Sequence, residues 1–216
     1  MCRNRIFDLT GNGEAESNRI KISKTVLSLL MTGAVILSGC GSDKDVTTVT
    51  VSKNGEITSD LVEDFDKDKY SIDDLDKTIS EEVSKYNSAN GADSVDAEKP
   101  KMKGDKTVCE KITFSSYRDY AGFNNSQFFC GTVSDALALG YDLGISLKDV
   151  KDSSKTMTGD EVASEMKDKH ILIIDEPLHV ITYGKILYIS DGVTSSGGKE
   201  ADISKDMDGT GYIVFE

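Results

Sequence analysis

The peptide Val46-Thr47-Thr48-Val49-Thr50-Val51, followed closely by Asn54-Gly55, decides the fold of the first half of the chain. Its residues are β-branched throughout, a composition typical of a strand. Asn-Gly is the strongest short signal for a hairpin turn, and Ile57, Leu61 and Val62 supply apolar positions for a returning strand. We therefore predict a β-hairpin that begins near residue 46.

An amphipathic helix is predicted after this hairpin. Ser71-Ile72-Asp73-Asp74 has the spacing of a capping box, with Asp in place of Glu. The apolar residues behind it recur on one helical stripe, and Asn90-Gly91 provides a stop. That stripe consists of Ile72, Leu75, Ile79, Val83 and Tyr86. Residues 41–90 are thus expected to form a hairpin-helix module, and the polar residues 91–106, which include Pro100, a linker or long loop.

The C-terminal region, 107–216, is predicted to be rich in β-structure. His170-Ile171-Leu172-Ile173-Ile174 is a continuous apolar run, typical of a central strand. Further strands are expected over residues 108–114, 180–183, 186–189 and 212–215, and short helices over 117–125 and 159–167. Residues 128–139 suit either a buried helix or a strand, turn and helix. The predicted class is α+β with a mostly antiparallel sheet, and the two regions together suit one domain.

A secretory signal precedes the hairpin. Basic residues at 19, 21 and 24 are followed by an apolar run over residues 25–36 and then by Leu37-Ser38-Gly39-Cys40. The run is shorter than the roughly 20 residues that a spanning helix needs. Residues 1–40 are therefore predicted to be a signal peptide, and the part before residue 18 is consistent with a misassigned translation start.

The peptide that ends at Cys40 resembles the lipobox of bacterial lipoproteins. The resemblance implies that Cys40 is acylated with fatty chains such as palmitate, that the bond before it is cut, and that it becomes the first residue of the mature protein. Two or more acyl chains hold a protein firmly on a bilayer. The expected location is the extracytoplasmic face of the cell membrane.

The charge of the mature part excludes some classes of partner. Removing residues 1–40 takes away five of the 25 basic and three of the 38 acidic side chains, which leaves 20 against 35 and a net charge of −15. A strongly acidic protein is repelled by phosphate backbones and by anionic lipid. Nucleic acid is therefore not an expected partner, and membrane contact is expected through the anchor alone.

Two cysteines, Cys109 and Cys130, remain after the signal and the anchor are set aside. In an oxidising exterior they could form one disulfide, and in an anaerobic habitat both would stay reduced. The sequence leaves both alternatives open, because it does not place the two Cα atoms.

No metal or cofactor motif is complete. Asp64, Asp66 and Asp68 alternate as in the start of a calcium loop, but Lys69 and Leu75 occupy the positions that require Gly and Glu. There is neither a Cys-x-x-Cys pair nor a phosphate-binding glycine loop. We predict no metal and no cofactor.

One set of residues suits a thiol enzyme. Cys130-Gly131-Thr132 could open a helix, which would lower the pKa of the thiol, while His179 and Asp191 follow in the chain. This order loosely resembles the NlpC/P60 cysteine peptidases of the cell wall. Phe129-Cys130-Gly131-Thr132 lacks the Asp-Cys-Ser-Gly of that family, however, and Phe128-Phe129 indicates a buried thiol. A small apolar core cysteine is the competing interpretation.

Several segments resemble a family of uncharacterised lipobox-containing lipoproteins from gut Firmicutes of the Lachnospiraceae type. These are residues 51–55, 62–68 with the helix that follows, 131–136 and 184–190. The resemblance implies a surface location and no dependence on a cysteine at position 130. The expected function is a non-catalytic module that binds a surface protein, an envelope component or a small ligand. The alternative is a cell-wall cysteine peptidase that uses Cys130 and His179.

Overall fold

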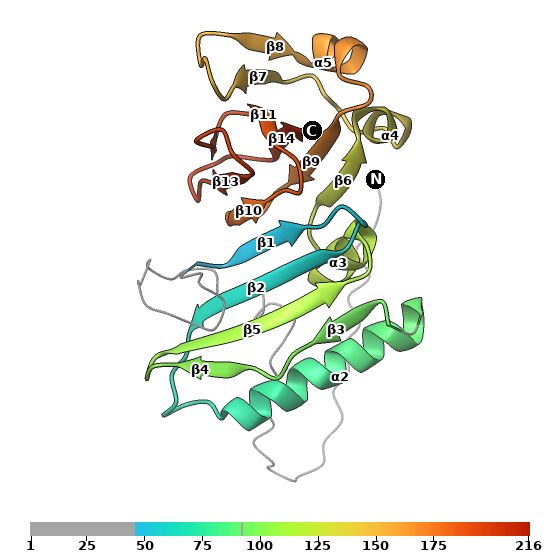
Figure 1. Ribbon diagram of the computed structural model, residues 1–216. Helices are drawn as coiled ribbons and strands as arrows, with labels where there is room; N and C mark the ends of the chain where they lie inside the picture. Colours follow the sequence, from blue (N-terminus) through green and yellow to red (C-terminus); the bar gives the residue numbers. More distant parts are fainter. Residues whose placement is uncertain (1–45, 92) are drawn as a thin grey trace, which may run out of the picture.

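The computed structural model describes residues 46–91 and 93–216. The predicted signal peptide and Cys40 lie outside the described residues. Two sheets and four helices make up the described part (Figure 1), which confirms the α+β class. None of its helices has both the length and the apolar character needed to cross a membrane.

The first sheet, called sheet A here, begins with the predicted hairpin. Strand β1 (Thr48–Val51) pairs antiparallel with β2 (Ile57–Asp64). Between them the amide of Gly55 donates to the carbonyl of Ser52, and Gly55 has a φ of +90°, a conformation that glycine adopts without strain. The hairpin and its Asn-Gly turn are thus confirmed.

Sheet A combines strands of the predicted hairpin-helix module with strands of the C-terminal region. Its order is β12-β13-β10-β1-β2-β5-β3, and β4 pairs with the other end of β5. The remaining strands are β3 (Val95–Ala97), β4 (Lys101–Lys103), β5 (Thr107–Phe114), β10 (His179–Ile181), β12 (Val193–Thr194) and β13 (Glu200–Ile203). Strand β1 pairs with β10 in parallel, and the other described pairings are antiparallel. The hairpin-helix module and the C-terminal region therefore share one sheet.

The predicted amphipathic helix is α2 (Ile72–Asn90), which lies along β3 and β4 in Figure 1. The Ser71 hydroxyl caps it by accepting a hydrogen bond from the amide of Asp73. Gly91 ends it with a φ of +124°. Ile79 is buried, and Val83 and Tyr86 pack against the main core.

Residues 91–106 differ from the predicted linker or long loop. They contain β3 and β4, which both pair with β5. The reason is local burial, since Val95 is only 2% exposed on the core side of the sheet. Strands of three residues are too short to give an alternating pattern in the sequence. Pro100 lies between them, where its missing N–H costs no ladder bond.

The second sheet, sheet B, has the order β6-β9-β14-β11-β7-β8. Its strands are β6 (Phe128–Thr132), β7 (Ser146–Asp149), β8 (Thr156–Thr158), β9 (His170–Ile174), β11 (Ile186–Ile189) and β14 (Gly211–Phe215). The predicted central strand is β9, which has β6 on one side and β14 on the other. The short helices are α3 (Tyr117–Asn124), α4 (Val133–Ala138) and α5 (Gly159–Glu165).

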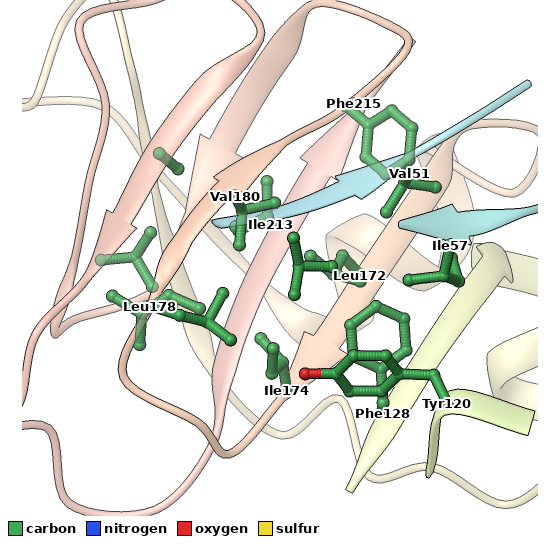
Figure 2. Packing of buried hydrophobic residues seen from close by; sticks show 14 of the residues in the cluster. Val51, Ile57, Tyr120, Phe128, Leu172, Ile174, Leu178, Val180, Ile213 and Phe215 are labelled. Carbon is green, nitrogen blue, oxygen red and sulfur yellow. The ribbon is translucent and has the colours of Figure 1, made fainter. Parts of the chain in front are cut away.

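The main core lies between the two sheets. Leu172, Ile174 and Phe215 of sheet B meet Val51 and Val180 of sheet A (Figure 2). The opposite face of sheet B forms a second cluster with α4 and α5, in which Phe129, Ile171, Ile173 and Val214 contact Val133 and Val162. Sheet B is therefore covered on both faces.

Candidate functional site

Cys130 lies in β6 and not at the start of a helix. Helix α4 begins three residues later, and the Thr132 side chain caps it. The thiol packs against the core between the sheets, and this burial raises the pKa of Cys130 to about 12. The expectation that Cys130 opens a helix is wrong, because Thr132 is the cap, and the thiol lacks the field that would favour a thiolate.

Cys109 and Cys130 are not joined to each other. Cys109 lies in β5 of sheet A. Cys130 lies in sheet B and is a free thiol. The predicted alternative of a bridge between these two cysteines is therefore wrong.

His179 lies on a different sheet from Cys130. It sits in β10 directly opposite Asp202 of β13, and its Nδ1 is 2.8 Å from the Asp202 Oδ1. Its Nε2 is 3.8 Å from the Glu200 Oε2. The three side chains, with Thr194, Ser195 and Ser196, line a shallow pocket at the end of sheet A.

Asp191, the third residue of the predicted set, is also elsewhere. It follows β11 in sheet B, where its carboxylate pairs with the Lys148 ammonium of β7. The structure does not bring Cys130, His179 and Asp191 together. Asp202 is the carboxylate beside His179, and only strand register, which is a nonlocal property, identifies it.

The imidazole on the same side of sheet B as Cys130 belongs to His170. Because Thr132 lies opposite His170 and Cys130 opposite Leu172, the side chains of Cys130 and His170 point to one face. The His170 ring contacts Tyr183 and Phe215, with ring centroids 5.2 and 5.6 Å away. Its buried Nδ1 has no hydrogen-bond partner. Burial lowers the pKa of His170, against the opposing effect of Asp135, so this imidazole is held in its neutral form.

A second pocket, called the Arg118 pocket here, lies where α3, β6 and α4 meet and encloses about 260 Å³. The Tyr117 ring stands edge-on to Phe129 at 5.0 Å, and the Arg118 guanidinium lies over Tyr117 at 5.4 Å. Gly131 also lines the pocket, and a Cβ there would lie 2.7 Å from the Phe129 ring, so a larger residue would displace that ring. Leu139, which is 53% exposed, forms the rim.

The charges of the Arg118 pocket are unusual for so acidic a protein. Arg118 is the only arginine after residue 19, and it makes no ion pair among the described residues. Asp135 also lines the pocket, and its Oδ2 accepts hydrogen bonds from the Thr132 amide and hydroxyl. The hydroxyl bond and then the amide bond hold the pKa of Asp135 below its usual range. The pocket thus offers an unpaired cation and an apolar wall beside a carboxylate whose Oδ2 is occupied.

Within residues 46–91 and 93–216, no three His, Cys, Asp or Glu side chains are placed to hold a metal ion. Of the acidic residues singled out in the sequence, Asp64 ends strand β2, and Asp66 accepts a hydrogen bond from the Asp68 amide in the turn that follows.

Comparison of the chain with protein-family models, curated proteins and solved structures found no match.

Proposed function

We propose that the protein is a lipid-anchored module on the extracytoplasmic face of the cell membrane, and that its folded domain binds a ligand or partner without cleaving it. The observation that carries the location is the basic, apolar and lipobox order that ends at Cys40. The resemblance to lipoproteins of gut Firmicutes supports the same location.

The start of the fold suits such an anchor. Seven residues separate Cys40 from β1. At about 3.3–3.6 Å for each extended residue, they span at most about 25 Å. A lipid on Cys40 would therefore hold the domain at the membrane surface, and its acidic charge would keep it from lying on anionic lipid.

The state of the thiol supports binding over peptide cleavage. A cysteine nucleophile attacks as its thiolate, whereas burial raises the pKa of Cys130 to about 12. The neighbouring His170 has a lowered pKa. His179 is occupied by Asp202 on the other sheet. A wall peptidase that uses Cys130 and His179 is thus the less favoured function.

The Arg118 pocket is the place where we expect a ligand. An unpaired guanidinium binds carboxylates strongly, and the Tyr117 and Leu139 surfaces suit an aliphatic group. The expected ligand chemistry is a carboxylate next to an aliphatic side chain, as at the C-terminus of a peptide.

Replacement of Cys40 tests the anchor. In cells fed an alkyne fatty acid, the Cys40→Ser protein should lose both the lipid label and its membrane association. Cys2→Ser is the matched control, since Cys2 lies before the basic region, and it should change neither. Lipid labelling that survives Cys40→Ser would overturn the proposed location.

Titration with acetyl-leucine tests the ligand, with acetyl-leucinamide as the uncharged counterpart. Only the carboxylate compound should shift the NMR signals of the Arg118 pocket, and Arg118→Gln should abolish the shift. Lys53→Gln removes an exposed cation at the hairpin turn and should leave the shift intact. Equal effects of the two compounds, or of the two variants, would contradict this role of Arg118 and leave the anchor unaffected.

A further inference from the structure

Glu110 is a buried carboxyl group in the middle of sheet A. It lies in β5, where alternation places it on the same face as Val108, Ile112 and Phe114, all of which are buried. Glu110 itself is 8% exposed. Its buried Oε1 has no hydrogen-bond partner. A buried polar atom without a partner is costly, so this carboxyl group calls for an explanation.

The groups that face Glu110 are acidic or apolar. On α2, the Asp76 carboxylate lies close enough to act on the Glu110 charge. On β2, Leu61 lies directly opposite and Glu63 is the diagonal neighbour, itself beside Asp64 and Lys205.

Strand β4 adds no charge on this face of the sheet. Its Met102 lies opposite Val108, while Lys101 and Lys103 lie opposite Cys109 and Thr107 and point to the other face. Lys99, just before β4, reaches Asp76 and Asp73, at 3.8 and 3.4 Å. Among residues 46–91 and 93–216, no cation is therefore seen to act on Glu110 directly, and an ionised Glu110 would be opposed by Asp76.

The two halves of α2 are held differently. In the second half, Asn87 exchanges two hydrogen bonds with the backbone of Val95, at 2.8 and 2.9 Å, and Tyr86 packs edge-on against Phe123. The first half contains Ile79, the one buried residue of α2, and is otherwise tied by the ion pairs of Lys99, which are exposed and worth little. The half that carries Asp76 thus has the weaker polar contacts with the rest of the domain.

We infer that the first half of α2 is a pH-sensitive flap, which docks on sheet A while the Glu110 carboxyl is protonated and loosens when that carboxyl ionises. Protonation leaves a neutral group under the helix. Ionisation leaves a charge that is both desolvated and close to Asp76, and the helix can relieve both costs by moving away and admitting water. The inference is independent of the lipid anchor and of the Arg118 pocket.

The direction of the pH effect follows from the shift. Burial, and secondarily Asp76, raises the pKa of Glu110 to about 7 in the docked state from an ordinary value of 4.5. A raised pKa means that the docked state binds the proton more tightly than the open state. Docking is therefore strongest below pH 4.5 and is progressively weakened as the pH rises through about 7.

Hydrogen exchange in the full chain, purified in detergent, tests the flap. Between pH 5.5 and 8.0, amides of residues 76–82 should lose protection by roughly tenfold, after correction for intrinsic exchange rates. Amides of residues 84–90, next to Asn87, should change far less. Glu110→Gln imitates the protonated carboxyl, and it should keep residues 76–82 protected at both pH values.

Two further variants keep the test decisive. Glu82→Gln removes an exposed charge from the same helix and should behave as the unmodified chain. Asp76→Asn should reduce the loss of protection and make it level off at a lower pH, which can be measured even if Glu110→Gln fails to fold. The inference is overturned if protection of residues 76–82 does not depend on pH in the unmodified chain. It is equally overturned if the dependence survives unchanged in Glu110→Gln or, should that variant not fold, in Asp76→Asn.

Discussion

Strand β9 of sheet B and strand β5 of sheet A both have a paired strand on either side, but β9 is buried on both faces and β5 on only one. In β9, Ile171, Leu172, Ile173 and Ile174 are all 0% exposed, because one core cluster covers each face of sheet B. In β5, buried and partly exposed residues alternate, and the buried row includes Glu110.

This difference in burial assigns different roles to the two sheets in the stability of the domain and in its response to pH. Sheet B buries apolar surface on both faces, and the Cys130 thiol inside it is kept neutral by burial. Sheet A buries one face and leaves Glu110 and Glu63 with raised pKa values. We therefore expect sheet B to set the stability of the domain and sheet A to set its response to pH.

Matched leucine deletions should give the largest contrast. Leu172→Ala in β9 empties a fully buried site, and we expect it to lower the free energy of unfolding by about 3 kcal/mol or more. Leu75→Ala in the half-buried first part of α2 should cost about 1 kcal/mol or less. Urea unfolding of both variants measures the two values, and equal losses would break the contrast between the sheets.

Helix caps should show the same contrast at a smaller scale. Thr132 caps α4 in a reciprocal box with Asp135, so Thr132→Ala should cost about 1 kcal/mol. Ser71 caps α2 by a single exposed bond, so Ser71→Ala should cost about 0.5 kcal/mol. Thermal unfolding ranks the two variants, and a larger loss for Ser71→Ala would show that the start of α2 is held more firmly than we infer.

Glu63 should give the smallest effect, and one that depends on pH. Burial, and secondarily Asp64, raises its pKa to about 7, against the attraction of Lys205. The stability of the protonated form is complete below pH 4.5 and is lost as the pH rises through about 7. Because Glu63 is only partly buried, we expect Glu63→Gln to raise the free energy of unfolding at pH 8 by less than about 1 kcal/mol after allowance for solvent screening.

The same variant should have no effect near pH 4.5. Urea unfolding at the two pH values, with Glu82→Gln as the exposed control, measures the difference. A gain at pH 4.5 as large as that at pH 8 would show that ionisation of Glu63 is not the cause.

Local patterns in the sequence predict those strands, turns and helices that are determined by residues close together in the chain. The apolar run at residues 170–174 identifies β9, because a strand covered on both faces needs no alternation. Asn54-Gly55 identifies the β1–β2 turn, and the cap at Ser71 with its apolar stripe identifies α2. In each case the determining contact lies within a few residues in the chain.

The remaining features depend on register between distant strands. The strands at Val95 and Met102 exist because β5 offers both of its ends as partners. The pairing of His179 with Asp202 likewise follows from β10 lying beside β13, and no spacing in the sequence indicates it. The burial of Glu110 in sheet A, within reach of the Asp76 charge, is also invisible to local patterns, which predict a solvated charge at that position.

Alkylation of Cys130 tests the central claim, that the domain binds rather than cleaves, most directly. The folded full chain is treated with iodoacetamide at pH 7, and peptide mapping follows the modification of Cys130 with time. A partly buried thiol whose pKa is raised to about 12 predicts slow alkylation, which becomes rapid only when urea unfolds sheet B. Rapid alkylation of the folded protein, together with cleavage of peptidoglycan fragments that Cys130→Ala abolishes, would contradict the account and favour the peptidase.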